Sequence, residues 1–472
     1  MDRADIYLEI IAEQPILLAP FALLIFIFAA TPSDKKLFIS LVILVPWLTV
    51  ARCEDLGPIA STAKLTSGVA YLIVAISAAM YPGPKRSIPA VVWLFVIIAF
   101  VSIFYVMTTE GVARALVMRL QWTCVTIAGV YTARMVVSYS NLTYILDALT
   151  LGCIFALALP VSAYLIDPVA SFLKGQGRFE PWGANSNQIG MLFALATPLF
   201  AYALMTLKKD SLKPLLMSAL IATIGMSVLT ASRQTILAIA LVMSPVLFVL
   251  IKRPIILILL LAFGLGGLAL IISMTETAEF DRLGSLETGR LDIWSAYFTE
   301  VFPKRPIFGL LGTSGESFEK SMNEVGMHPH NAWLYWMYLG GLSLALPMLF
   351  LAVYSSYCGI RIWKLRKYLP GTPLLYSILV MLLLTMYFQG LFNQVVYWPT
   401  YTWSFLHVVL SALFICIWHD IKNGNFSEAL YDDTVTYDYE EYALDTVEDF
   451  EVAEQKMKIH TLTESDSSWI FD

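Results

Sequence analysis

The residue types best suited to chemistry gather in residues 274–331, the only long polar interruption of an otherwise almost continuously apolar sequence. Arg290 lies in the first half of this segment, and His328, His330 and Asn331 close it, directly before apolar sequence resumes. A guanidinium binds phosphate or carboxylate oxygens through paired donors, and histidine has the ordinary pKa best placed for proton transfer near neutral pH. These residues, with several aromatics, predict a site that handles an anionic, lipid-linked group at a membrane surface.

Two further arginines lie in short polar stretches between apolar segments. Arg233 belongs to a turn that joins two apolar segments with almost no loop. An arginine at such a position either extends its charge back to the membrane surface or turns inward to meet a phosphate, and the sequence leaves both interpretations open. Arg178, with Asn185 and Asn187 after it, offers further polar groups for substrate binding from another polar stretch.

A metal site is the main functional alternative for the two histidines of the long polar segment. Such a site needs three or four ligands, and the segment has no spaced third histidine or cysteine beside His328 and His330. A histidine that simply lies at the membrane interface is a second alternative. We therefore expect no metal and no cofactor, and the interfacial histidine stays open.

The composition indicates which elements position these residues. Of the 472 residues, 58% are apolar and 14% are charged, whereas a soluble protein is about half apolar and about a quarter charged. This balance predicts an all-α, polytopic membrane bundle of twelve or thirteen spans, and no nucleic-acid partner is expected. The predicted spans are residues 15–30, 37–51, 61–80, 88–108, 114–137, 145–166, 188–206, 214–230, 234–251, 254–273, 332–358, 373–393 and 400–418.

The distribution of lysine and arginine predicts the orientation of the bundle. Short cytoplasmic loops carry an excess of these residues, and here their clusters fall on one side if every predicted span is real. That side is predicted to be cytoplasmic. Residues 167–187, 274–331 and 394–399 then face the periplasm or the cell exterior, so the predicted site is extracytoplasmic.

The chain divides into a membrane bundle, residues 1–419, and an acidic tail, residues 420–472. The tail holds 15 acidic and 3 basic residues, which leaves the bundle with a net charge of +6. Because like charges at this density repel one another, the tail is predicted to be disordered on the cytoplasmic side. Its interleaved aromatic residues leave open a docking motif for a cytoplasmic partner.

Two local patterns predict helices within and after the long polar segment. Apolar and aromatic residues recur at three- and four-residue steps over residues 291–302, Trp294 among them, which is typical of an amphipathic helix with Arg290 in its first turn. A second helix is predicted to begin around His330, because apolar residues follow at helical spacing. This interpretation places His330 on a rigid helix at membrane depth, with Asn331 beside it.

Several short motifs follow one another along residues 179–341. They are Gly183-Ala184-Asn185-Ser186-Asn187-Gln188 before a span, Ser232-Arg233-Gln234 at a later turn, Gly289-Arg290 followed by Trp294, Pro306-Ile307-Phe308-Gly309, and His330-Asn331-Ala332-Trp333-Leu334. In order and sidedness this set resembles the O-antigen ligase family, whose relatives include O-antigen and exopolysaccharide polymerases. One departure is Gly309-Leu310-Leu311-Gly312, where the family more often has two glycines separated by one residue.

The resemblance implies a metal-independent membrane glycosyltransferase of the bacterial inner membrane, active in lipopolysaccharide or exopolysaccharide biosynthesis. Its partners would be a glycan on an undecaprenyl diphosphate carrier, an acceptor glycan or glycolipid, and membrane lipids. Arg290 and Arg233 would hold the diphosphate, and His330 would activate or position the acceptor hydroxyl. The further substrate-binding candidates are Arg178, Asn185, Asn187, Trp294, His328 and Asn331. An O-antigen ligase, a polymerase of lipid-linked repeat units, a polysaccharide transporter and a non-catalytic membrane partner all stay open.

Overall fold

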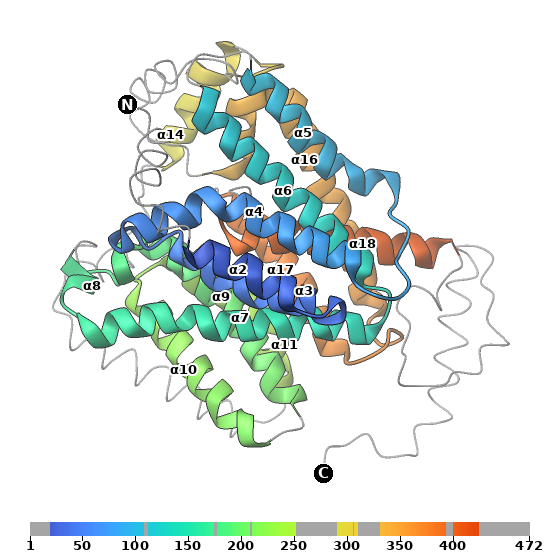
Figure 1. The fold of residues 1–472 in the computed structure, drawn as a ribbon. Coiled ribbons are helices and arrows are strands. Elements are labelled where there is room, and N and C mark those ends of the chain that lie inside the picture. The colour runs from blue at the N-terminus through green and yellow to red at the C-terminus, as the bar shows by residue number, and fades with distance from the viewer. Residues whose placement is uncertain are drawn as a thin grey trace.

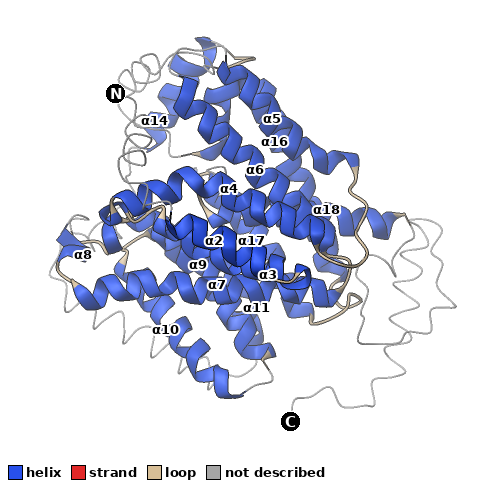
Figure 2. Cartoon of the chain, in the orientation of Figure 1, coloured by secondary structure: helices blue, strands red, loops and turns tan. Residues whose placement is uncertain are grey.

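The computed structural model describes residues 19–107, 112–173, 177–207, 210–251, 290–304, 306–309, 331–392 and 400–423 (Figure 1). Every regular element in these ranges is a helix, and none is a strand (Figure 2). Seven of the described helices are long and apolar enough to cross a membrane. The predicted all-α, polytopic membrane bundle is therefore confirmed for this part of the chain.

The described helices follow the predicted spans closely. The long ones are α2 (Ala19–Ala30), α3 (Ser33–Val50), α4 (Pro58–Met80), α5 (Leu94–Met107), α6 (Val112–Met135), α7 (Tyr139–Ile166), α9 (Ser186–Thr206), α10 (Lys213–Leu229), α11 (Arg233–Ile251), α16 (Ala332–Leu365), α17 (Pro373–Gly390) and α18 (Thr402–Lys422). The short ones are η2 (Glu54–Leu56), η3 (Ala90–Trp93), α8 (Ala170–Leu173), η4 (Pro181–Gly183), η5 (Asp210–Leu212), α14 (Arg290–Ala296), η6 (Tyr297–Val301) and η7 (Phe302–Lys304). Twelve of the thirteen predicted spans overlap the long helices, and the other, residues 254–273, lies outside the described residues. The acidic tail beyond residue 423 also lies outside them.

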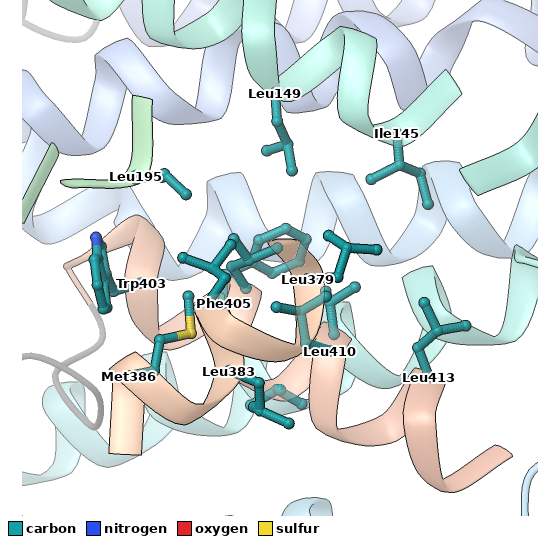
Figure 3. Packing of buried hydrophobic residues seen from close by; sticks show 14 of the residues in the cluster. Ile145, Leu149, Leu195, Leu379, Leu383, Met386, Trp403, Phe405, Leu410 and Leu413 are labelled. Atoms are coloured by element: carbon teal, nitrogen blue, oxygen red, sulfur yellow. The ribbon is translucent and has the colours of Figure 1, made fainter. Parts of the chain in front are cut away.

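Helix α18 forms the centre of the bundle. Its side chains are buried almost without interruption over residues 402–421, and it packs against α3, α6, α9, α16 and α17. A helix that is apolar on all sides is suited to such enclosure. Figure 3 shows its Phe405 and Leu410 in one buried cluster with Leu379 of α17 and Leu149 of α7. The helices that carry the candidate site are therefore held around one central helix.

Large apolar side chains also cover the outside of the bundle. Leu165, Phe248 and Val353 are 73%, 76% and 62% exposed, respectively. Lipid tails are as apolar as leucine, so such side chains meet no penalty on a surface that faces the membrane. The outer surface of the described helices is therefore suited to lipid.

The two ends of the bundle carry different polar contacts. At one end lie α8, η4 and α14, toward the left of Figure 1, and this end is referred to below as the α14 end. At the opposite end Arg86 forms a buried ion pair with Asp420 near the end of α18. Arg86 Nε also donates a hydrogen bond to the carbonyl of Val136 at 2.9 Å, directly after α6. The guanidinium therefore ties three segments together far from α14.

Helix α16 is broken at Gly341, where the predicted Pro-Ile-Phe-Gly turn docks. Gly341 has φ +57° and ψ −151°, a conformation that glycine alone adopts without strain. The backbone N–H groups of Leu342 and Ser343 donate to the carbonyls of Pro306 and Ile307, at 2.8 and 3.0 Å. The turn is therefore present, and backbone hydrogen bonds hold it against α16.

The predicted amphipathic helix is also present, although its geometry changes along its length. It begins as α14, continues through the π-helical turn η6, and ends in the 3₁₀ turn η7. A π-helical turn shifts the residues that follow it relative to an ideal helix. Tyr297, the first residue of the π-helical turn, packs against α16 and is 4% exposed.

Candidate functional site

Three segments of the chain meet in a polar network at the α14 end. Arg178 Nη2 donates a hydrogen bond to Asn187 Oδ1 at 2.9 Å, and Ser232 Oγ donates to the same oxygen at 2.9 Å. Arg178 Nε donates to the carbonyl of Thr230 at 3.0 Å. The network joins the segment before η4, the first turn of α9, and the turn between α10 and α11. The structure thus brings together two predicted substrate-binding residues, Arg178 and Asn187, beside the turn that carries Arg233.

The turn between α10 and α11 fixes the place of Arg233. Ala231 has a φ of +46°, a conformation that few residues with a side chain adopt. Arg233 follows as the first residue of α11, where it is half-buried. Helices α9 and α11 also touch so closely that a Cβ on Gly190 would overlap the side chain of Thr235. The start of α11 therefore packs tightly against the start of α9, and this contact fixes the position of Arg233 at the α14 end.

The end of α17 links the start of α11 to α14. Gln389 is 1% exposed, and its Nε2 donates to the carbonyl of Gln234 at 2.8 Å. Gln234 Nε2 donates to the carbonyl of Phe392 at 3.0 Å. The ring centroid of Phe392 lies 6.4 Å from that of Trp294 in α14. Trp294, predicted for substrate binding, is thus joined to the turn of Arg233 through residues that the sequence analysis did not identify.

Helix α14 and its continuation pack against the first turns of α16. The rings of Tyr297 and Tyr338 lie 6.0 Å apart at 71°, within a buried cluster that includes Leu334 and Tyr335. The start of α16 also touches α17, since Trp333 and Tyr387 have ring centroids 6.2 Å apart. Helices α14, α16 and α17 therefore form one packed unit at this end.

Two predicted substrate-binding asparagines act as helix caps in the described structure. Asn185 Oδ1 accepts a hydrogen bond from the backbone of Asn187 at 3.0 Å and caps α9. Asn331 Oδ1 accepts from the backbone N–H groups of Trp333 and Leu334 at 2.9 and 3.0 Å and caps α16. Both asparagines satisfy backbone donors that a helix start leaves unpaired.

The start of α16 agrees with the predicted span, residues 332–358, and differs from the predicted helix start around His330. The helix begins at Ala332, after an extended Asn331 with φ −140°, and not around His330. The capping oxygen of Asn331 requires this extended backbone, so the described helix starts directly after its cap at Asn331. His328 and His330 lie outside the described residues, and Arg290 is described only as the first residue of α14.

Arg52 is a cation of the same end that the sequence analysis did not identify. Its Nε donates to the carbonyl of Thr400 at 3.3 Å, its Nη2 donates to the hydroxyl of the same residue, and its guanidinium lies 3.5 Å from the ring centroid of Tyr401. With Gln188 it lines a partly open pocket of about 360 Å³, a volume that includes open solvent. Burial lowers the pKa of the Arg52 guanidinium, which stays protonated because arginine titrates far above neutral pH. In the sequence, the feature that could have drawn attention to Arg52 is its position directly after the predicted span of residues 37–51.

The chemistry of the described polar groups suits an oxyanion and hydroxyl groups. Arg178, Arg233 and Arg52 bring guanidinium groups to the α14 end, and Ser232 and Asn187 add a hydroxyl and an amide. Among the described residues, no three His, Cys, Asp or Glu side chains come together in a group that could hold a metal ion. Phosphate and carboxylate oxygens are the ligands that such guanidinium groups bind best.

No protein-family model, curated protein or solved structure matches this chain. The resemblance to the O-antigen ligase family therefore stays a prediction that rests on the motifs themselves.

Proposed function

We propose that this protein transfers a glycan from an undecaprenyl diphosphate carrier to a hydroxyl group of an acceptor sugar, at the α14 end of the bundle. The observation that carries the proposal is the contact of Arg178, Asn187 and Ser232 beside Arg233, with Trp294 joined to them through the end of α17. These groups come from distant segments of the chain and share one end of the bundle. A lipid-linked glycan presents its diphosphate and its sugars at such an end, while its prenyl chain stays in the membrane.

The proposed reaction needs a proton acceptor and groups that stabilise a diphosphate leaving group. The hydroxyl oxygen of the acceptor attacks the anomeric carbon of the donor, the bond from this carbon to the diphosphate oxygen breaks, and the hydroxyl proton passes to His330. Undecaprenyl diphosphate leaves. Arg290 and Arg233 hold its two phosphates, because cations aimed at developing negative charge are usually the largest source of rate. Arg178, oriented by Asn187, adds a further guanidinium for the donor.

The proposal requires the α14 end to face the periplasm. The lysine and arginine clusters at residues 35–36, 85–86 and 361–367 belong to the opposite end, where α3, α5 and α17 begin. Such clusters mark the cytoplasmic side. The protein then lies in the bacterial inner membrane with its C-terminus inside, and it serves lipopolysaccharide or exopolysaccharide biosynthesis.

The test is glycan transfer by the purified protein in lipid nanodiscs, with an undecaprenyl-diphosphate-linked glycan and an acceptor glycolipid. Arg233→Lys and Arg290→Lys should lower transfer sharply, because lysine keeps the charge but loses the paired donors. His330→Ala should lower transfer by about two to four powers of ten while donor binding persists, since a base acts on the acceptor. Arg361→Lys, at the opposite end, is the control and should transfer normally. Full transfer by His330→Ala would remove the mechanism.

The choice of acceptor distinguishes the alternative functions. A polymerase lengthens lipid-linked repeat units when they are both donor and acceptor, whereas a ligase transfers only to the other glycolipid. A transporter or a non-catalytic partner forms no new glycosidic bond with either acceptor. Deleting the gene gives the matching result in cells: lipopolysaccharide without its polymer for a ligase, and single repeat units for a polymerase.

A further inference from the structure

A further cation, Arg119, is buried where α6 packs near α16. It belongs to α6 and is 8% exposed. Its guanidinium carbon lies 5.9 Å from the ring centroid of Trp336 in α16, and this ring lies 6.1 Å from that of Trp122. The hydroxyl of Tyr335 is within hydrogen-bonding reach of the same guanidinium. Arg119 is therefore surrounded by aromatic side chains from two helices.

The described residues leave the charge of Arg119 without full compensation. None of their carboxylates forms an ion pair with it, and they offer its buried Nε no hydrogen-bond acceptor. A buried charge and an unsatisfied buried donor both cost free energy, and a tryptophan face and one hydroxyl replace little of the lost hydration. An arginine inside a membrane span is usually functional for this reason. An anion would compensate the charge of Arg119, and none of the described residues supplies one at this position.

The location of Arg119 defines how such an anion would arrive. The backbone N–H of Tyr335 donates to the carbonyl of Asn331 at 3.0 Å, so Tyr335 and Trp336 lie one turn into α16, about 5 Å deeper than its cap. Leu120, the residue after Arg119, is 47% exposed on the outside of the bundle. This level of α6 therefore borders the lipid, which suits an anion attached to a lipid chain better than one that diffuses in water.

Arg119 is also separate from the network around Arg178. Its contacts are with α16, whereas Arg178 binds the start of α9 and the turn between α10 and α11. Arg119 instead adjoins the aromatic cluster through which α14 packs on α16, because Tyr335 belongs to both. It therefore extends the candidate site toward the segments that carry Arg290 and His330.

We propose that Arg119 binds a phosphate group of the lipid-linked diphosphate substrate where α6 meets the first turns of α16. This role rests on the proposed function, and it makes Arg119 a substrate-binding residue that recognises the lipid diphosphate itself and not the glycan. The same phosphate chemistry occurs in the headgroups of ordinary phospholipids, so the test must separate these two sources.

The test measures binding of farnesyl diphosphate, a short prenyl diphosphate, to the full-length protein in nanodiscs of phosphatidylcholine. A charge-assisted hydrogen bond of this kind corresponds to about a tenfold to a hundredfold change in affinity. Arg119→Gln should weaken farnesyl diphosphate binding by that factor and leave the weak binding of farnesol unchanged. Because neither glycan nor acceptor is present, this result stays interpretable if glycan transfer is not observed.

Arg361→Gln is the matched control, since Arg361 also lies over a tryptophan, 4.8 Å from the ring centroid of Trp418, but at the opposite end. It should bind farnesyl diphosphate as the unchanged protein does. Arg119→Lys is the second variant in case Arg119→Gln fails to fold, and it should weaken binding less. The contrary result is a folded Arg119 variant that binds farnesyl diphosphate with unchanged affinity but unfolds at a lower thermal midpoint. That result would make Arg119 a structural support of Trp336 and overturn the proposal. Equal competition by phosphatidylglycerol would make the position a general headgroup site and would also overturn it.

Discussion

Replacing Gly341 by alanine tests whether the turn at residues 306–309 is held by the break in α16. A Cβ at this position would lie 2.5 Å from the carbonyl oxygen of Pro306 and 2.6 Å from the carbonyl carbon of Ile307. The clash is with backbone, which cannot rotate away as the end of a side chain can. The turn must therefore move off α16, and the backbone hydrogen bonds that Leu342 and Ser343 donate to it are lost.

The magnitude follows from the conformation and the two hydrogen bonds. A residue with a side chain in the backbone conformation of Gly341 costs about 1–3 kcal/mol. Each backbone hydrogen bond contributes about 0.5–1.5 kcal/mol net. The added strain of about 1–3 kcal/mol thus offsets the roughly 1–3 kcal/mol that the two hydrogen bonds contribute together, so the turn should undock in a large share of molecules. The loss is local, because the core around α18 is unaffected.

Hydrogen–deuterium exchange of the amides of Leu342 and Ser343 is the direct assay. In Gly341→Ala these amides should exchange about ten- to a hundredfold faster. Glycan transfer should also fall, because the turn is continuous with α14. Gly225→Ala is the control: Gly225 lies inside α10, and its added Cβ would meet nothing within 4 Å. It should change neither exchange nor transfer. Equal protection of Leu342 and Ser343 in Gly341→Ala and the unchanged protein would refute this account of the turn.

Three further predictions concern the opposite end, the orientation and metals. Asp420→Asn removes the carboxylate that forms the buried ion pair with Arg86 and should lower the free energy of unfolding by about 3–5 kcal/mol, whereas Asp210→Asn, in an exposed pair, should leave the thermal midpoint unchanged. A tag at Gly315 should react with an impermeant reagent on intact cells and one at Asp472 should not; labelling of Asp472 would reverse the orientation. EDTA should leave transfer intact, and strict dependence on a divalent ion would reopen the two histidines of the polar segment as ligands.

The spans could be predicted from the sequence because lipid imposes a simple requirement. A helix that crosses a membrane needs a long apolar run, so the runs alone locate the helices. Their ends are less certain, as α16 shows. Helical spacing counted from His330 predicts a start around that residue, but the helix starts at Ala332 because Asn331 adopts an extended backbone and caps it. Whether a residue caps a helix depends on its backbone conformation, and the spacing of apolar residues does not indicate that conformation.

Residue type alone could not separate the caps from the residues of the polar network. Asn185 and Asn187 are the same amino acid in the same motif, yet Asn185 caps α9 while Asn187 accepts hydrogen bonds from Arg178 and Ser232. The difference is set by residues far along the chain, since the turn that supplies Ser232 must first meet the start of α9. A motif predicts which residues gather, and the packing of the helices decides which of them is left to bind a ligand.

Gln389 shows why part of the site could not be predicted at all. Within its apolar span it is one amide, with no neighbour in the sequence that marks it as important. Its function in the fold comes from Gln234, whose carbonyl it binds and whose own amide reaches Phe392. A buried amide N–H without a partner would cost about as much as a lost hydrogen bond, and here each Nε2 reaches a backbone carbonyl that the packing of α11 and α17 brings close. The connection between Arg233 and Trp294 therefore depends on a pair that exists only after α11 and α17 have packed.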